Sequence, residues 1–168
     1  MSYCHINLTR VGALLFAVIL TGCASTPQTR DEHKELMKNN QRWTLVDSYT
    51  SNHPFDDVVG VIDKKWQECY NVSKTTSTTR NGLKSGSKDE YHPQSHKVNN
   101  SLTEMTLQMT TSMKMLNTIP PGGFYFVALD IQRLPGNKTK LTWYSSSEWK
   151  NSWEKNKQWS DGKNVSCE

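Results

Sequence analysis

Four side chains of the kinds that bind metals or transfer protons lie close together in the sequence: Asp89, Glu90, His92 and His96. Imidazole and carboxylate groups are zinc ligands, and two histidines four residues apart would share one face of a helix. Pro93 stands between the histidines, however, and residues 84–100 are polar without a helical or strand period. We therefore expect a mobile, solvated loop with at most a short strand near Tyr91. His92 and His96 are only weak candidates for a metal site.

The other residues that could take part in catalysis lack the surroundings that catalysis needs. Ser95 lies beside His96, but no glycines of a nucleophile elbow surround it. Asp130 is set among apolar residues and is expected to pair with Lys138 or Lys140 across a hairpin. The sequence has no paired-carboxylate motif and no phosphate-binding loop, so it predicts neither an enzyme nor a cofactor.

The first 22 residues have the pattern of an export signal. Residues 1–10 are polar and end in Arg10, and Val11–Leu20 is an apolar run without a charge. Such a run fits the apolar region of a signal peptide, whereas a membrane-spanning helix needs about 20 apolar residues. We expect the chain to be exported.

The apolar run ends in Leu20-Thr21-Gly22-Cys23, which resembles the lipobox of bacterial lipoproteins. The resemblance covers residues 1 to about 25. It implies cleavage before Cys23 and attachment of a diacylglycerol and an N-acyl chain to that cysteine. More than one acyl chain is what stable membrane anchoring requires. Ala24 follows the cysteine where an aspartate would imply retention at the inner membrane, so the resemblance favours the outer membrane of a two-membrane cell.

Two cysteines remain once Cys4 is removed with the signal peptide and Cys23 is acylated. These are Cys69 and Cys167. Two thiols in an oxidising compartment favour a disulfide, which would close a loop of nearly one hundred residues. Two buried free thiols, or a bond between chains, are the alternatives.

Composition allows one modest core and excludes one class of partner. Only 35% of residues are hydrophobic, but six Trp and six Tyr each bury a large area. Loss of the signal peptide removes one basic residue, Arg10, and no acidic one, which lowers the net charge from +4 to +3. The charges are interspersed, so no nucleic-acid binding is expected.

Apolar periodicity predicts two helices and four strands. The helices are Pro54–Tyr70 and a second one that begins at a capping box, Ser145 to Glu148, and ends near Gly162. Turn residues separate the strands at Asn81-Gly82 and at Leu134–Asn137. The strands are expected at 72–79, 105–115, 124–134 and 138–145.

The predicted fold class is α+β: an antiparallel sheet of four or five strands, covered by an N-terminal and a C-terminal helix and tied by one disulfide. The order of elements resembles that of helix-grip domains. Met105, Leu107 and Met109 should face the helices, with Thr106 and Gln108 more exposed.

We expect three segments: a signal peptide at 1–22, a lipidated N-terminus and flexible tether at 23–51, and one domain at 52–168. Within the tether, residues 43–49 include four apolar side chains that could form a short strand or pack onto the domain.

The sequence favours a non-catalytic envelope lipoprotein that binds a protein or another envelope component. Trp149, Trp153 and Trp159 cannot all share one helix face, so at least one should be exposed, and this helix is the predicted binding surface. A periplasmic immunity or inhibitor lipoprotein that neutralises a toxic enzyme is the alternative. A metal-dependent enzyme built on His92 and His96 is a third hypothesis.

Overall fold

The computed structural model describes residues 26–40, 42–80, 83–112 and 119–167. The predicted signal peptide and lipobox, the Asn81-Gly82 turn and the end of the predicted 105–115 strand lie outside these residues. Among the described residues, no helix is long and apolar enough to cross a membrane.

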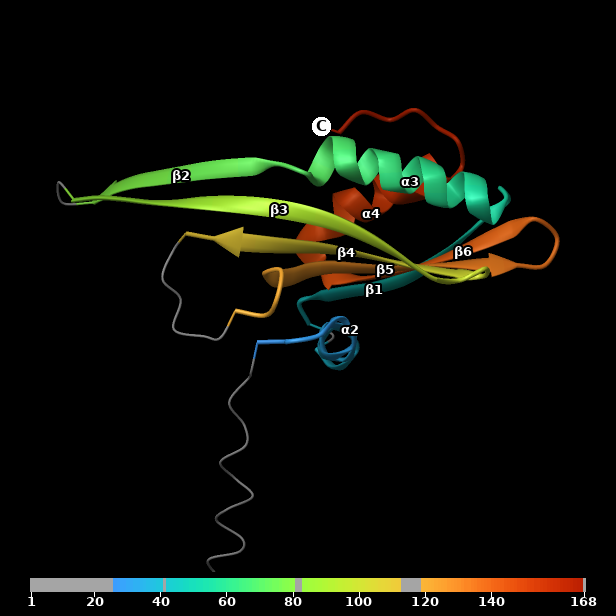
Figure 1. The fold of residues 1–168 in the computed structure, drawn as a ribbon, viewed down its shortest axis with the longest axis horizontal. Coiled ribbons are helices and arrows are strands. Elements are labelled where there is room, and N and C mark those ends of the chain that lie inside the picture. Colours follow the sequence, from blue (N-terminus) through green and yellow to red (C-terminus); the bar gives the residue numbers. More distant parts are fainter. Residues whose placement is uncertain (1–25, 41, 81–82, 113–118, 168) are drawn as a thin grey trace, which may run out of the picture.

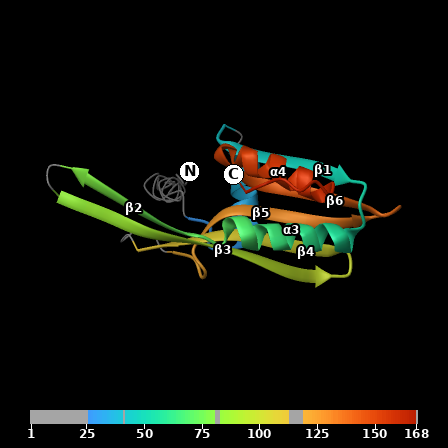
Figure 2. The same ribbon diagram turned by 90° about the horizontal axis from the view of Figure 1, so that it is seen from above.

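The chain forms one six-stranded antiparallel sheet with helices on both faces (Figures 1 and 2). The spatial order of strands is β1-β6-β5-β4-β3-β2, so the first and last strands of the sequence pair side by side. The strands are β1 Thr44–Ser51, β2 Ser73–Arg80, β3 Leu83–Asn99, β4 Leu102–Thr111, β5 Phe124–Leu134 and β6 Lys138–Ser146. The helices are α2 Arg30–Asn39, α3 Phe55–Tyr70, the 3-10 turn η2 Ser147–Trp149 and α4 Lys150–Ser160.

The α+β class and antiparallel sheet are confirmed, but the sheet has six strands instead of the predicted four or five, and a third helix, α2, is present. Helices α3 and α4 cover one face of the sheet and enclose the core. Four tryptophans fill the space between these helices and the strands: Trp66, Trp143, Trp153 and Trp159. The rings of Trp143 and Trp153 stack with centroids 5.5 Å apart. Each of the four indole N–H groups donates a hydrogen bond within the domain, for example Trp66 Nε1 to Asn156 Oδ1 at 2.8 Å. The core therefore buries these large rings without leaving their polar atoms unpaired.

Helix α2 covers the opposite face of the sheet, which the sequence pattern predicts to be exposed. Met105 and Leu107 are buried beneath α3 and α4 as expected, but Thr106 and Gln108 are also only 9% and 3% exposed. Gln108 Nε2 donates hydrogen bonds to the carbonyls of Pro121 and Gly123, both at 3.0 Å. Because both faces of the central strands are covered, alternating side chains do not separate into buried and exposed sets.

Residues 30–51 differ from the flexible tether that the sequence predicts. Arg30–Asn39 is helical, and Thr29 caps the helix by accepting a hydrogen bond from the Glu32 N–H at 3.2 Å. Thr44–Ser51 then forms the edge strand β1 beside β6. The ordered part of the chain therefore begins well before residue 52.

Residues 84–100 form most of a strand of 17 residues, β3, so the prediction of a mobile loop is wrong. Pro93 is accommodated because β2 pairs only with the first half of β3, up to Glu90. The Tyr91 N–H points to this side and donates to the Val72 carbonyl at 2.9 Å. The nitrogen of Pro93, two residues on, faces the same open edge, where no ladder hydrogen bond is lost.

The predicted disulfide joins Cys69, at the end of α3, to Cys167, with 5.2 Å between the two Cα atoms. The C-terminal segment runs from the end of α4 back to the end of α3 (Figure 1). Trp159 Nε1 donates to the carbonyl of Val165 at 3.0 Å, so this segment also closes the core over α4.

Candidate functional site

An open cleft of about 670 Å³ lies where the β2–β3 pair leaves the helical layer. Figures 1 and 2 show this pair as an arm that extends past α3 and α4. The cleft, called the aromatic cleft below, is lined by Cys69, Tyr70, Val72, Ser73, Lys74, Tyr91, Leu107, Trp149, Ser152 and Cys167. Its size falls within the range of small-ligand sites in proteins.

Three aromatic rings form the walls of the cleft. The ring centroids of Tyr70 and Trp149 are 6.0 Å apart, and those of Tyr91 and Trp149 are 6.5 Å apart. Phe126 supports both Tyr91 and Trp149 from β5, with edge-to-face contacts at 5.7 Å and 6.0 Å. Leu107 on β4 also lines the cleft and is almost fully buried. The three rings and the supporting Phe126 come from four different elements, so the packed domain holds them in place.

A few polar groups stand among these rings. The Tyr70 hydroxyl is buried, with Ser152 and Asn156 as its polar neighbours. Burial raises the pKa of this hydroxyl, and the neighbouring Ser152 and Asn156 oppose the increase. Lys74 Nζ lies 5.7 Å from the ring centroid of Tyr91, a cation–π distance. An apolar site with a few convergent polar groups is the usual form of a ligand-binding site.

The local sequence explains why a cleft forms here. Asn71 and Val72 separate α3 from β2, so the chain leaves the helical layer and enters the sheet within two residues. The residues that follow, Ser73 to Ser77 (SKTTS), are all polar and exposed, so they add no apolar side chain to the core. The core therefore ends at Tyr70, Tyr91 and Trp149, and the rings at its end face the cleft.

Of the three tryptophans in the predicted binding surface, only Trp149 is accessible to solvent. Trp153 and Trp159 are 1% and 0% exposed, so they belong to the core and cannot form a binding surface. Trp149 is half-buried and lines the cleft. The predicted capping box does not form, because Ser145 Oγ instead accepts a hydrogen bond from Trp143 Nε1 at 2.7 Å. Helix α4 therefore starts through the turn η2, which carries Trp149.

The structure does not bring His92 and His96 together. Both lie on β3, where a rise of roughly 3.3 Å per residue separates them by about 13 Å. His92 Nε2 lies 3.2 Å from Thr110 Oγ1, and His96 is exposed opposite Glu104. Within the described residues, no three His, Cys, Asp or Glu side chains are placed to share a metal ion.

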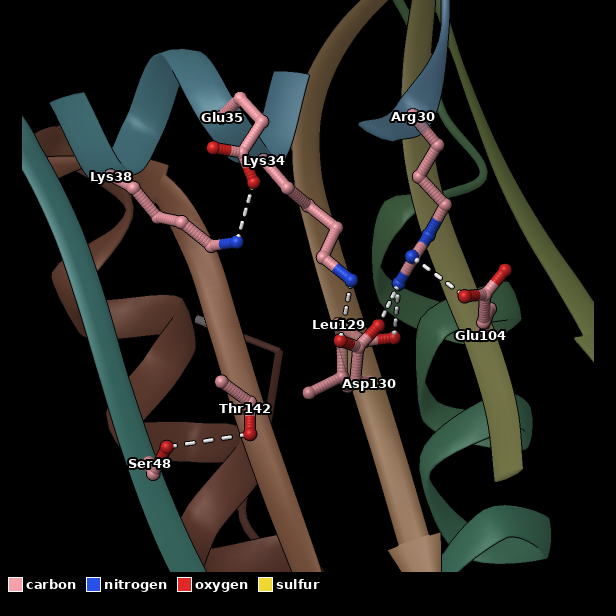
Figure 3. A network of polar contacts seen from close by, with 9 residues as sticks. All are labelled: Arg30, Lys34, Glu35, Lys38, Ser48, Glu104, Leu129, Asp130 and Thr142. Atoms are coloured by element: carbon pink, nitrogen blue, oxygen red, sulfur yellow. Dashed lines mark hydrogen bonds and ion pairs between the residues drawn. The ribbon is translucent and has the colours of Figure 1, made fainter. Parts of the chain in front are cut away.

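Asp130 does not pair with Lys138 or Lys140, because its partners are on α2 instead. Lys34 Nζ donates to Asp130 Oδ2 at 2.7 Å, and Arg30 also binds the Asp130 carboxylate (Figure 3). Arg30 Nη1 also binds Glu104 Oε1 at 3.0 Å, so acids on both β4 and β5 form ion pairs with helix α2. This network docks α2 on the sheet.

Sequence reasoning misses three residues of the cleft: Tyr70, Lys74 and Tyr91. Tyr70 continues the apolar stripe of α3 and is therefore assigned to the core. Tyr91 is an isolated aromatic residue in a polar segment, and this isolation is the only sequence signal that marks it.

Comparisons with known proteins assign neither a family nor a function. No family model and no curated protein matches the chain. Among solved structures it is similar to the hypothetical protein jhp0584 of Helicobacter pylori, at 13% identity and a TM-score of 0.37, over 71% of this chain and 84% of that chain. It is also similar to protein MLL2253 of Mesorhizobium loti, at 12% identity and a TM-score of 0.35, over 73% of this chain and 99% of that chain. Both scores are too low for either likeness to support an argument about fold or function.

Proposed function

We propose that this chain is a lipid-anchored protein of the bacterial cell envelope that binds an envelope component in the aromatic cleft without catalysing a reaction. The lipobox supports acylation of Cys23, and Ala24 favours the outer membrane, with the domain facing the periplasm. The expected partner is a protein or another envelope component, and nucleic acid is not expected.

The aromatic cleft is the observation that carries the binding role. Rings whose hydrophobic surface could be buried in the core instead line a hollow of about 670 Å³. Burial of apolar area contributes about 25 cal/mol per Å², so a ligand that covers these rings would gain stabilisation that the free protein lacks.

The proposed anchor would keep the cleft close to a membrane. The helix cap Thr29 comes six positions after Cys23, a span of at most roughly 20 Å when fully extended. Confinement of this kind raises the effective concentration of a membrane-bound partner, so a modest affinity is enough for occupancy.

The anchor is tested by labelling cells with radioactive palmitate. Cys23→Ser should abolish incorporation of the label and release the protein from the membrane fraction. Cys4→Ser is the matched control, because Cys4 lies in the predicted signal peptide, and this variant should be labelled normally. A Cys23→Ser protein that remains labelled and membrane-bound would exclude the anchor.

The cleft is tested by complementation of a deletion strain. Trp149→Leu should impair complementation, whereas Trp43→Leu should not, because Trp43 is 63% exposed and lies outside the cleft. Ser152→Leu is a second variant, which fills the cleft without removing an aromatic ring. If both cleft variants fold and complement fully, the cleft is not the functional site.

A further inference from the structure

From the charge at its mouth, we infer that the aromatic cleft binds an anionic amphiphile, with its apolar chain between the rings and its carboxylate or phosphate head at Lys74. This inference rests on the proposed function, because it names the ligand class of the same cleft.

The walls of the cleft match an apolar chain more closely than a polar ligand. Leu107, Val72 and the rings of Tyr70 and Trp149 line the hollow, and the Cys69–Cys167 disulfide lines it as well. The space between α4 and the sheet is already filled by the four core tryptophans. A ligand would therefore lie in the cleft beside the arm and would not enter the centre of the domain.

Lys74 is the one cationic side chain among the described residues that line the cleft, and it forms no salt bridge with another described residue. Asp89 stands directly opposite Lys74 in the strand register. Its carboxylate accepts hydrogen bonds from Thr111 Oγ1 at 2.6 Å and from Ser87 Oγ at 3.4 Å. Lys88, on the paired strand β3, differs from Lys74 because it forms a salt bridge: its Nζ is 2.5 Å from Glu90 Oε1.

The position of Lys74 favours an anion that also carries apolar surface. Its Nζ is held over the Tyr91 ring at the mouth of the cleft, so an anion that binds there brings its chain against Tyr91 and Trp149. Ser152 lines the same hollow, so its hydroxyl can bond the polar end of a ligand. Removal of water from the cleft would strengthen the attraction between Lys74 and the head group.

The test uses the full chain with Cys23→Ser, exported to an oxidising compartment, so that no acyl group competes for the cleft. Titration calorimetry compares four probes with the same chain below their micelle concentrations: dodecanoate, dodecyl phosphate, dodecanol and dodecyltrimethylammonium. We expect at least one of the two anions to bind tenfold or more tightly than the alcohol and the cation. A preference for dodecanoate indicates a free fatty acid, and a preference for dodecyl phosphate indicates a lipid phosphate head.

Lys74→Gln should remove the preference for anions while leaving the binding of dodecanol unchanged. Lys64→Gln is the matched control, since Lys64 is an exposed lysine of α3 outside the cleft. Dodecanol that binds as tightly as both anions, with no effect of Lys74→Gln, overturns the anionic ligand while the cleft remains a binding site. Failure of all four probes to bind also overturns the inference. The proposed function is then decided separately by the complementation of Trp149→Leu.

Discussion

Lys34 Nζ of helix α2 donates a hydrogen bond to the Asp130 carboxylate of β5 at 2.7 Å, on the sheet face opposite the aromatic cleft. The two side chains are only 15% and 18% exposed, and Arg30 binds the same carboxylate. One acid therefore holds two cations of α2 against the sheet. Loss of that acid would leave both cations poorly solvated, so it should weaken the docking of the whole helix.

Asp130→Asn should lower the free energy of unfolding by roughly 2–4 kcal/mol, because it removes one partner of a largely buried charge network. The measurement is urea denaturation, with hydrogen exchange of the α2 amides to locate the effect. Asp63→Asn is the control, since Asp63 on α3 has no ion pair in the described part of the chain. Equal stabilities for the two variants would show that the network does not hold α2.

Stability should fall in mild acid because of His33. Burial lowers the pKa of this imidazole from 6.5 to about 4, with a smaller contribution from nearby Arg30 and an opposing one from a backbone hydrogen bond of Tyr144. Between these two values the unfolded chain binds a proton that the folded chain does not. Neutral His33 therefore contributes fully to the free energy of unfolding above about pH 6.5. As the pH falls towards 4, this contribution is lost and the free energy of unfolding decreases by about 3 kcal/mol in all.

The measurement for His33 is the free energy of unfolding as a function of pH. His33→Phe keeps an aromatic ring beside Tyr125, whose ring centroid lies 5.9 Å from that of His33, but it has no proton to bind. The variant should show a flatter dependence between pH 7 and 4. A variant that loses as much stability as the native protein over this range would assign the effect to other groups.

Removal of the Cys69–Cys167 disulfide should destabilise the domain by about 2–5 kcal/mol, because the unfolded chain gains the freedom of a loop with 98 residues of separation. The Cys69→Ser, Cys167→Ser double variant is compared with the native protein by thermal denaturation. Ligand binding should weaken as well, because both cysteines line the cleft. Unchanged stability and affinity would show that the disulfide supports neither the fold nor the cleft.

Function should survive the loss of both candidate metal ligands. His92→Ala with His96→Ala should complement a deletion strain like the native gene, because β3 holds the two rings too far apart to share a metal ion. If the double variant folds, is lipidated and fails to complement, a site built on these histidines replaces the binding role.

Regular patterns in the sequence predict the features that build the core. The apolar stripe of α3, the disulfide and the strands β5 and β6 follow from periodicity, turn residues and cysteine count. By contrast, β3 has no apolar alternation because its first half pairs with β2 in the arm beyond the helices. Strand pairing orders this segment without a row of buried apolar side chains, and a single sequence carries no clear signal of pairing.

Helix α2 is missed for a different reason. His33 is its one buried residue, and Arg30 and Lys34 dock it through ion pairs with acids distant in the sequence. The cleft is missed because its walls come from segments that only the folded chain brings together. Trp149 could be predicted from the sequence, because the last helix has more aromatic residues than one buried face can hold. Tyr91 and Lys74 could not, because they reach the cleft only through the paths of strands β3 and β2.

The most direct test of the binding role is photo-crosslinking in living cells with the lipidated protein. A photoreactive residue at Tyr91 lies in the cleft, whereas one at Val98 lies on the same strand, 45% exposed and outside it. We predict an adduct at position 91, identified by mass spectrometry as an envelope component, and none of that mass at position 98. An empty position 91, or the same adduct at equal yield from both positions, would contradict the assignment of the cleft as the binding site.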